Sequence, residues 1–335
     1  MPSRKQLWER SILELVYDPD EFHVLASDSP DFHLSREGGP PFGVEITDVF
    51  PDESDARMRM VPGYMQSLWE GGRHIHKDDV ERLEVTTLEV TDADGGNKRS
   101  ILGIVRESMS PADHFERVAR AIERKNDSFL GYEKSLGHVN LILADHISER
   151  PREDREFRTS EILSPRVREA LRVTPFRSVR LIAHVGYTDS VYYELDLLWL
   201  WEGFVVYMEA IRQTYGAMAE FDHEDVAVLY AHAMREIGWP VELSWQANQP
   251  FAVAGDYGIA AVDGRGIVIH DHQDWPLDTL AIRPRSKVSR DVEERVARRF
   301  RAMLPNSTLV SSYATPVRPW RRADDDPDVP SAIDR

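Results

Sequence analysis

The sequence predicts a mixed α/β protein in which helices flank a mixed sheet, followed by a C-terminal α+β domain. Over the first 198 residues, short apolar segments rich in β-branched residues alternate with segments whose apolar residues recur at helical spacing. Farther along, two apolar segments joined by Asp263-Gly264-Arg265-Gly266 predict a β-hairpin that follows two helices.

The first predicted hairpin brings two carboxylates together. One strand begins at Asp31, a Gly/Pro turn covers Glu37–Pro41, and the next strand runs from Phe42 to Val49 with Glu45 in its middle. Opposite residues of an antiparallel pair lie within about 5 Å of each other. Two carboxylates at that range repel unless a cation lies between them, and Mg²⁺ and Mn²⁺ prefer oxygen ligands. The hairpin therefore predicts a metal site at Asp31 and Glu45.

The second strand of this hairpin alternates in character. Phe42, Val44 and Ile46 predict a face against a helix layer, so Glu45 and Thr47 are expected to face a cleft. The alternative is an ordinary amphipathic hairpin whose polar face is solvated.

A helix is predicted from Pro111 to Lys125, because its apolar residues recur at helical spacing: Phe115, Val118, Ala119 and Ile122. Lys125 lies at the edge of that apolar face. It either reaches the carboxylates or is a solvated charge at a helix C-terminus. Glu116 and Glu123 are alternative candidates for a polar side facing the site.

The Asp31 and Glu45 segments resemble a known motif. Pro30-Asp31 followed by the strand Gly43-Val44-Glu45-Ile46-Thr47 is similar to the pattern of the PD-(D/E)XK nuclease superfamily, over about 150 to 200 residues. In that superfamily the two acids hold a catalytic Mg²⁺ or Mn²⁺, and the residue two after the Glu is usually Lys. Thr47 occupies this position here. Some members supply the lysine from a nearby helix, which makes Lys125 the candidate.

The resemblance implies a restriction-endonuclease-like fold and a metal-dependent nuclease. Its metal ligands would be Asp31 and Glu45, and Thr47 and Lys125 would complete the catalytic residues. Members often add an acid from an N-terminal helix, so Glu9 or Glu14, in the helix predicted over Gln6–Tyr17, is a further candidate. The implied substrate is nucleic acid, DNA before RNA, in restriction, repair or anti-phage defence. The alternative is a catalytically inactive scaffold or assembly subunit, which the threonine favours.

Composition limits these expectations. The chain of 335 residues has no cysteine, so disulfides and thiol chemistry are excluded, and its formal net charge is −17. No long uninterrupted apolar run predicts a membrane span, and a cytoplasmic protein is expected. An acidic protein binds nucleic acid through clustered cations or with help. Two arginine-rich segments, 166–180 and 283–301, are candidate phosphate-binding surfaces. A protein partner that supplies targeting, or a homo-oligomer, is the alternative.

We expect three units: residues 1–198 as the nuclease-like domain, 199–320 as the C-terminal domain for partner or nucleic-acid binding, and 321–335 as a disordered acidic tail. A rival chemistry is a zinc site at His270-Asp271-His272-Gln273-Asp274, which resembles the ligand motif of metallo-β-lactamase-like hydrolases. Trp275 replaces the expected sixth-position histidine there. His74-Ile75-His76 is a second, polar candidate.

Overall fold

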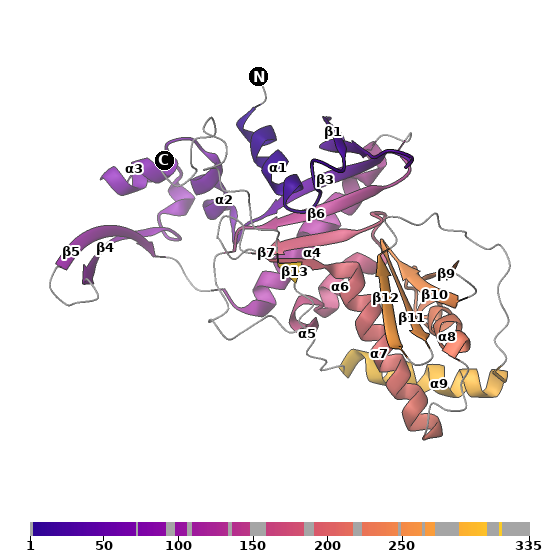
Figure 1. Ribbon diagram of the computed structural model, residues 1–335. Coiled ribbons are helices and arrows are strands. Elements are labelled where there is room, and N and C mark those ends of the chain that lie inside the picture. The colour runs from indigo at the N-terminus through magenta and orange to yellow at the C-terminus, as the bar shows by residue number, and fades with distance from the viewer. Residues whose placement is uncertain are drawn as a thin grey trace.

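The computed structural model confirms a mixed α/β architecture with a helix-flanked mixed sheet and a further antiparallel sheet toward the C-terminus (Figure 1). It describes residues 3–71, 73–91, 98–105, 109–132, 136–147, 159–183, 191–216, 223–246, 249–262, 265–271, 288–306 and 315–316.

The described residues form a main sheet of seven strands. Its order is β1 (His23–Ala26), β2 (Phe32–Ser35), β3 (Phe42–Val49), β6 (Val139–Asp145), β7 (Val179–Ala183), β8 (Val191–Glu194) and β13 (Thr315–Pro316). The three central strands, β3, β6 and β7, are parallel, and the outer pairs are antiparallel. Strands β6 and β7 are buried along their whole length, as expected for parallel strands covered on both faces.

Helices cover both faces of this sheet. On one face, α1 (Arg4–Glu14) packs Ile12 and Leu13 into a core with Val44 and Ile46 of β3. On the other face lie α4 (Pro111–Ser128), α5 (Thr159–Ile162), α6 (Pro165–Arg172) and α7 (Leu195–Tyr215). Because β3 alternates, Glu45 points toward the α4 face, and it is only 6% exposed. The expectation of an open cleft beside Glu45 was therefore wrong: α4 packs over that face.

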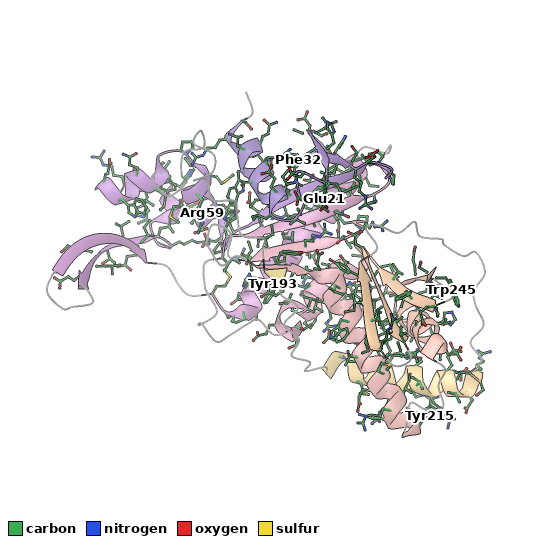
Figure 2. All side chains as sticks on the ribbon, viewed as in Figure 1. Glu21, Phe32, Arg59, Tyr193, Tyr215 and Trp245 are labelled. Carbon is green, nitrogen blue, oxygen red and sulfur yellow. The ribbon has the colours of Figure 1, made fainter. Side chains whose placement is uncertain are left out.

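An insertion between β3 and α4 forms a projection with its own small core (Figure 1). It contains α2 (Glu53–Met60), α3 (Tyr64–Gly71), η1 (Lys77–Asp79), β4 (Glu84–Thr91) and β5 (Lys98–Val105). The carboxylate of Asp79 is fully buried and accepts hydrogen bonds from the hydroxyls of Ser54 at 2.7 Å and Tyr64 at 2.5 Å. Arg59, labelled in Figure 2, donates to the His146 carbonyl at 3.4 Å and ties the insertion to the end of β6.

The C-terminal part adds an antiparallel sheet and two long helices. Its elements are α8 (His223–Glu236), β9 (Glu242–Gln246), β10 (Gln249–Ala254), β11 (Tyr257–Val262), β12 (Gly266–Asp271), α9 (Arg290–Met303) and η4 (Leu304–Asn306). Strands β11 and β12 confirm the predicted hairpin. Helix α7 packs against both sheets, α8 against the second sheet, and α9 against α7.

The expected boundary at residue 198 falls inside α7, whose apolar residues belong to a core shared by both sheets. The division into two units therefore stays a prediction, and the tail 321–335 lies outside the described residues. No helix in the described part of the chain is long and apolar enough to span a membrane.

Candidate active site

Asp31 and Glu45 lie together because of the β2–β3 register. Phe32 pairs with Val44, which places the preceding Asp31 opposite Glu45 just beyond the last ladder pair. The Asp31 amide donates to Glu45 Oε2 at 3.3 Å, and the amide of Ile46 donates to Asp31 Oδ2 at 2.8 Å. The Asp31 side chain thus accepts the hydrogen bond that the Ile46 amide of β3 would otherwise give to a neighbouring strand, and the two carboxylates are held side by side.

Lys125 reaches Glu45 from α4, which covers the face of the sheet toward which Glu45 points. Its ammonium group forms an ion pair with Glu45 Oε1 across 80 residues of sequence, and its side chain is 24% exposed. The reading of Lys125 as a solvated helix charge was therefore wrong. Glu116 and Glu123 pair instead with Arg166 of α6, at 3.5 and 3.0 Å, and do not face the site.

The N-terminal helix contributes Glu9 rather than Glu14. Glu9 is 6% exposed and pairs with Lys5 at 2.9 Å, whereas Glu14 is exposed and pairs with Arg10. The charge of Glu9 acts on Asp31, where it favours the protonated form of that carboxyl. We call this group the acidic cluster; its members are Lys5, Glu9, Asp31, Glu45 and Lys125.

The acidic cluster carries more negative than positive charge, and this excess contributes to a raised pKa of the Asp31 carboxyl. Burial raises the pKa of Asp31 to about 7, and the charges of Glu45 and Glu9 act in the same direction. The hydrogen bond from the Ile46 amide and the charge of Lys5 oppose this shift without reversing it. Burial raises the pKa of Asp196 to about 7 as well, so the shift makes Asp31 a candidate for a functional residue without setting it apart from a buried structural acid.

Thr47 lies on the same side of β3 as Glu45 and is partly exposed, and its side chain makes no hydrogen bond with the described residues. The residue that sequence reasoning missed is Tyr132. It follows the turn η2 (Phe129–Gly131) at the end of α4, and burial, then the charges of Glu45 and Asp31, raise the pKa of its hydroxyl. The only sequence signal was its position just after the helix that carries Lys125.

The donor set of this site suits a hard divalent cation. Asp31 and Glu45 offer carboxylate oxygens, and Asp31 Oδ1 makes no hydrogen bond within the described part of the chain. Those residues contain no group of three or more histidine, aspartate or glutamate side chains placed to hold a metal. Mg²⁺ does not need such a group, because it is commonly held by one or two carboxylates, water and substrate phosphates.

The candidate phosphate-binding arginines are mostly paired with carboxylates of the chain itself. Arg166, Arg168, Arg172 and Arg177 pair with Glu123, Glu202, Glu169 and Asp256. Arg180 is fully buried, so its assignment to a surface was wrong. On α9, Arg298 is exposed and has no partner among the described residues, whereas its neighbour Arg299 donates to Gln213. Residues 283–287 lie outside the described part.

The rival zinc sites gain no support from the described histidines. His74 Nε2 lies 2.7 Å from the Leu83 carbonyl oxygen, a backbone contact rather than a ligand arrangement. His270 is the second-last residue of β12, and His272 lies outside the described residues.

None of the family models, curated proteins or solved structures compared with this chain matches it. Any functional conclusion therefore depends on the geometry of the acidic cluster and on the residues that form it.

Proposed function

We propose that this chain is a metal-dependent nuclease that hydrolyses phosphodiester bonds of nucleic acid, with DNA favoured over RNA. The observation that carries the proposal is the convergence of Asp31, Glu45 and Lys125 from three separate segments into one partly buried group. A purely structural role explains a lysine and one carboxylate, but not a second carboxylate held against the first at the cost of a raised pKa.

Asp31 and Glu45 would hold Mg²⁺ or Mn²⁺. The bound ion would polarise the phosphoryl group and lower the pKa of an attacking water. Asp31 must be deprotonated to serve as a ligand, and its pKa near 7 means that cation and proton compete for this oxygen at neutral pH.

Lys125 supplies the positive charge that Thr47 does not. Its ion pair with Glu45 holds the ammonium group beside that carboxylate, where it would stabilise negative charge that develops on the phosphate. Glu45 fixes the position of this lysine, and the Ile46 amide fixes that of Asp31. Thr47, which faces the same side, would orient water or a phosphate oxygen through its hydroxyl.

Cleavage of single- and double-stranded DNA and RNA in Mg²⁺ or Mn²⁺ tests the proposal. We expect wild-type protein to cut, Glu45→Ala to lose cutting, and Glu14→Ala to retain it, because Glu14 is an exposed glutamate of α1 outside the acidic cluster. Cutting that survives in Glu45→Ala would contradict the proposal. A role in restriction, repair or anti-phage defence is suggested by the resemblance alone.

A catalytically inactive scaffold is the second candidate. Two observations favour it: Thr47 in the usual lysine position, and a net charge of −17 with most described arginines paired internally. The discriminating measurement is thermal stability with and without Mn²⁺. A metal-binding site gains stability with the ion, and Asp31→Asn abolishes the gain. A folded protein that neither cuts nor gains stability would favour the scaffold.

A further inference from the structure

The exposed apolar side chains of the molecule are concentrated in the insertion between β3 and α4. In the described part of the chain nine large apolar side chains are exposed, and five of them belong to the insertion, each between 42% and 55% exposed: Met60, Trp69, Ile75, Val80 and Leu88. Single exposed apolar residues are normal on a protein surface, but several on one small unit indicate an interaction surface. The insertion is therefore the region where we expect a binding partner.

Strands β4 and β5 of the insertion form a two-stranded ribbon whose outer edges are unpaired. Eight consecutive residue pairs join the strands, from Glu84 with Val105 to Thr91 with Lys98, and no third strand of the described residues pairs with either. The ribbon extends away from the main sheet (Figure 1). A two-stranded ribbon is only marginally stable in water. Its unpaired amides and carbonyls are a template for a further strand.

The two edges of the ribbon differ in charge. Strand β4 carries Glu84 and Glu89, which are both exposed, and charged residues on an edge strand oppose pairing with another chain. Strand β5 begins with Lys98 and Arg99, and its remaining residues, 100–105, include no charged residue. An uncharged segment that is rich in β-branched residues and lacks proline pairs readily with another strand. The edge of β5 is therefore the one open to pairing.

A second copy of the chain fits this edge. Across a twofold axis, β5 would lie antiparallel to the same strand of the partner, and the uncharged segments of the two copies would face each other. A register centred on Ile101 pairs Ser100 with the partner's Leu102 and Lys98 with the partner's Ile104. No two like charges are then directly opposite each other, so the edge of β5 is complementary to itself.

We propose that the edge of β5 is a dimerisation surface, at which two copies of the chain join their ribbons into one four-stranded antiparallel sheet. Such a sheet has the three or more strands that a stable sheet needs, which a single ribbon lacks. Both of its outer edges are β4 strands protected by Glu84 and Glu89, so association ends with two copies. The inference is independent of the proposed nuclease function.

Sedimentation velocity over a series of protein concentrations tests the proposal, with Ser100→Lys as the test variant and Thr87→Lys as its matched control. Both substitutions replace an exposed hydroxyl residue of the ribbon, on β5 and on β4 respectively. Ser100 lies opposite Glu89 within the ribbon, so the new lysine meets an opposite charge there and is compatible with the folded ribbon.

We expect wild type and Thr87→Lys to dimerise equally. Ser100→Lys should raise the dissociation constant of the dimer about tenfold or more, because its ammonium group would lie against the uncharged strand of the partner. Wild type that stays monomeric at every concentration would overturn the proposal, and so would equal dissociation constants for wild type and Ser100→Lys. Equal weakening by Thr87→Lys would overturn the assignment to the edge of β5.

Hydrogen exchange followed by mass spectrometry tests the same surface in wild type alone, so it holds even where Ser100→Lys disturbs the ribbon. Peptides that cover residues 100–105 should exchange more slowly as the protein concentration rises, because pairing with the partner protects their free amides. Peptides from α2 should not change. Exchange of residues 100–105 that is independent of concentration would overturn the proposal. Protection confined to β4 would place the interface on the other edge and overturn it as well.

Discussion

Two buried ionic clusters on the main sheet differ in how their charges are balanced. The acidic cluster has three carboxylates and two lysines. In the second, which we call the arginine cluster, acids pair directly with arginines; its members are Tyr17, Arg177, Arg180, Glu194 and Asp256. The buried carboxyl of Asp196 lies beside this cluster and accepts a hydrogen bond from the Val179 amide. In the arginine cluster both Glu194 and Asp256 pair with arginines, whereas in the acidic cluster Asp31 forms no ion pair with the described residues.

The arginine cluster is satisfied in detail. Arg180 Nε donates to both carboxylate oxygens of Glu194 at 2.8 Å, and its Nη2 donates to Asp256 Oδ2 at 3.0 Å. Arg180 also donates to the hydroxyl of Tyr17, whose pKa burial raises to about 12. Arg177 donates to the other oxygen of Asp256 at 2.9 Å. These bonds join the end of α1, the main sheet and the β10–β11 turn, so we assign the cluster a structural role.

The largest loss in the free energy of unfolding should follow from replacing Arg180 in the arginine cluster. Arg180→Met leaves the carboxylate of Glu194 buried without a counter-charge and leaves Asp256 with Arg177 alone, and we expect a loss of about 3 to 5 kcal/mol in the free energy of unfolding. Urea denaturation measures it. Asp256→Asn, which keeps the shape of the side chain, serves if Arg180→Met does not fold. A loss no greater than that of Lys125→Met would erase the distinction between the clusters.

A smaller effect, an increase in the free energy of unfolding, is expected for Asp31→Asn. Its pKa near 7 in the folded protein lies above the unfolded value of about 3.9, so the folded protein holds an extra proton between these values. The stability this proton provides is full below about pH 4 and is lost as the pH rises through 7. Asp31→Asn does not ionise, and should exceed wild type by on the order of 2 kcal/mol above pH 7.

The measurement is urea denaturation from pH 4 to 8, with Glu14→Gln as the control for an exposed acid of α1. The gap between Asp31→Asn and wild type should open as the pH rises and close when Mn²⁺ is added, because the ion stabilises only wild type. A gap that is constant with pH would show that Asp31 ionises normally in the folded protein.

Lys125 should matter less to stability than to chemistry. Its ion pair with Glu45 is partly exposed, and Lys125→Met should cost about 1 kcal/mol or less. Loss of a charge that stabilises the reacting phosphate typically lowers the rate by about 10²- to 10³-fold. Steady-state cleavage assays measure this decrease in rate, with Lys125→Arg as the control that keeps the charge. Equal rates in Lys125→Met and wild type would remove this lysine from the catalytic residues.

The sequence predicted those parts of the fold that local patterns determine. The strand Phe42–Val49 and the helix from Pro111 were predicted correctly, because alternation and helical spacing are properties of neighbouring residues. The helices α2 and α3 of the insertion were not predicted, because short amphipathic segments give a weak signal.

The sequence predicted those site residues that lie on one hairpin and one helix. Asp31 and Glu45 meet through the register of the hairpin, and this register could be inferred from the turn between the two strands. Glu9 and Arg180 show which residues the sequence pattern could not place correctly. Glu9 lies off the apolar stripe of α1 and is nevertheless buried, and Arg180 is buried because Glu194 and Asp256 neutralise it. Partners brought together by tertiary structure leave no spacing to detect, so a buried charge is mistaken for a surface one.

The smallest effect on the free energy of unfolding is expected from an ion pair at the surface, Arg172 with Glu169. Arg172 donates to both oxygens of Glu169, at 2.9 and 2.5 Å, and lowers the pKa of Glu169, a geometry as regular as that of Arg180 with Glu194. Exposed pairs contribute little, because water solvates both charges once they separate. Glu169→Gln should therefore unfold at the same urea concentration as wild type, in the assay that detects Arg180→Met. A clear shift would mean that pairing geometry, rather than burial, sets the energy of these contacts. The contrast between the acidic and arginine clusters would then need an explanation other than the charge each one buries.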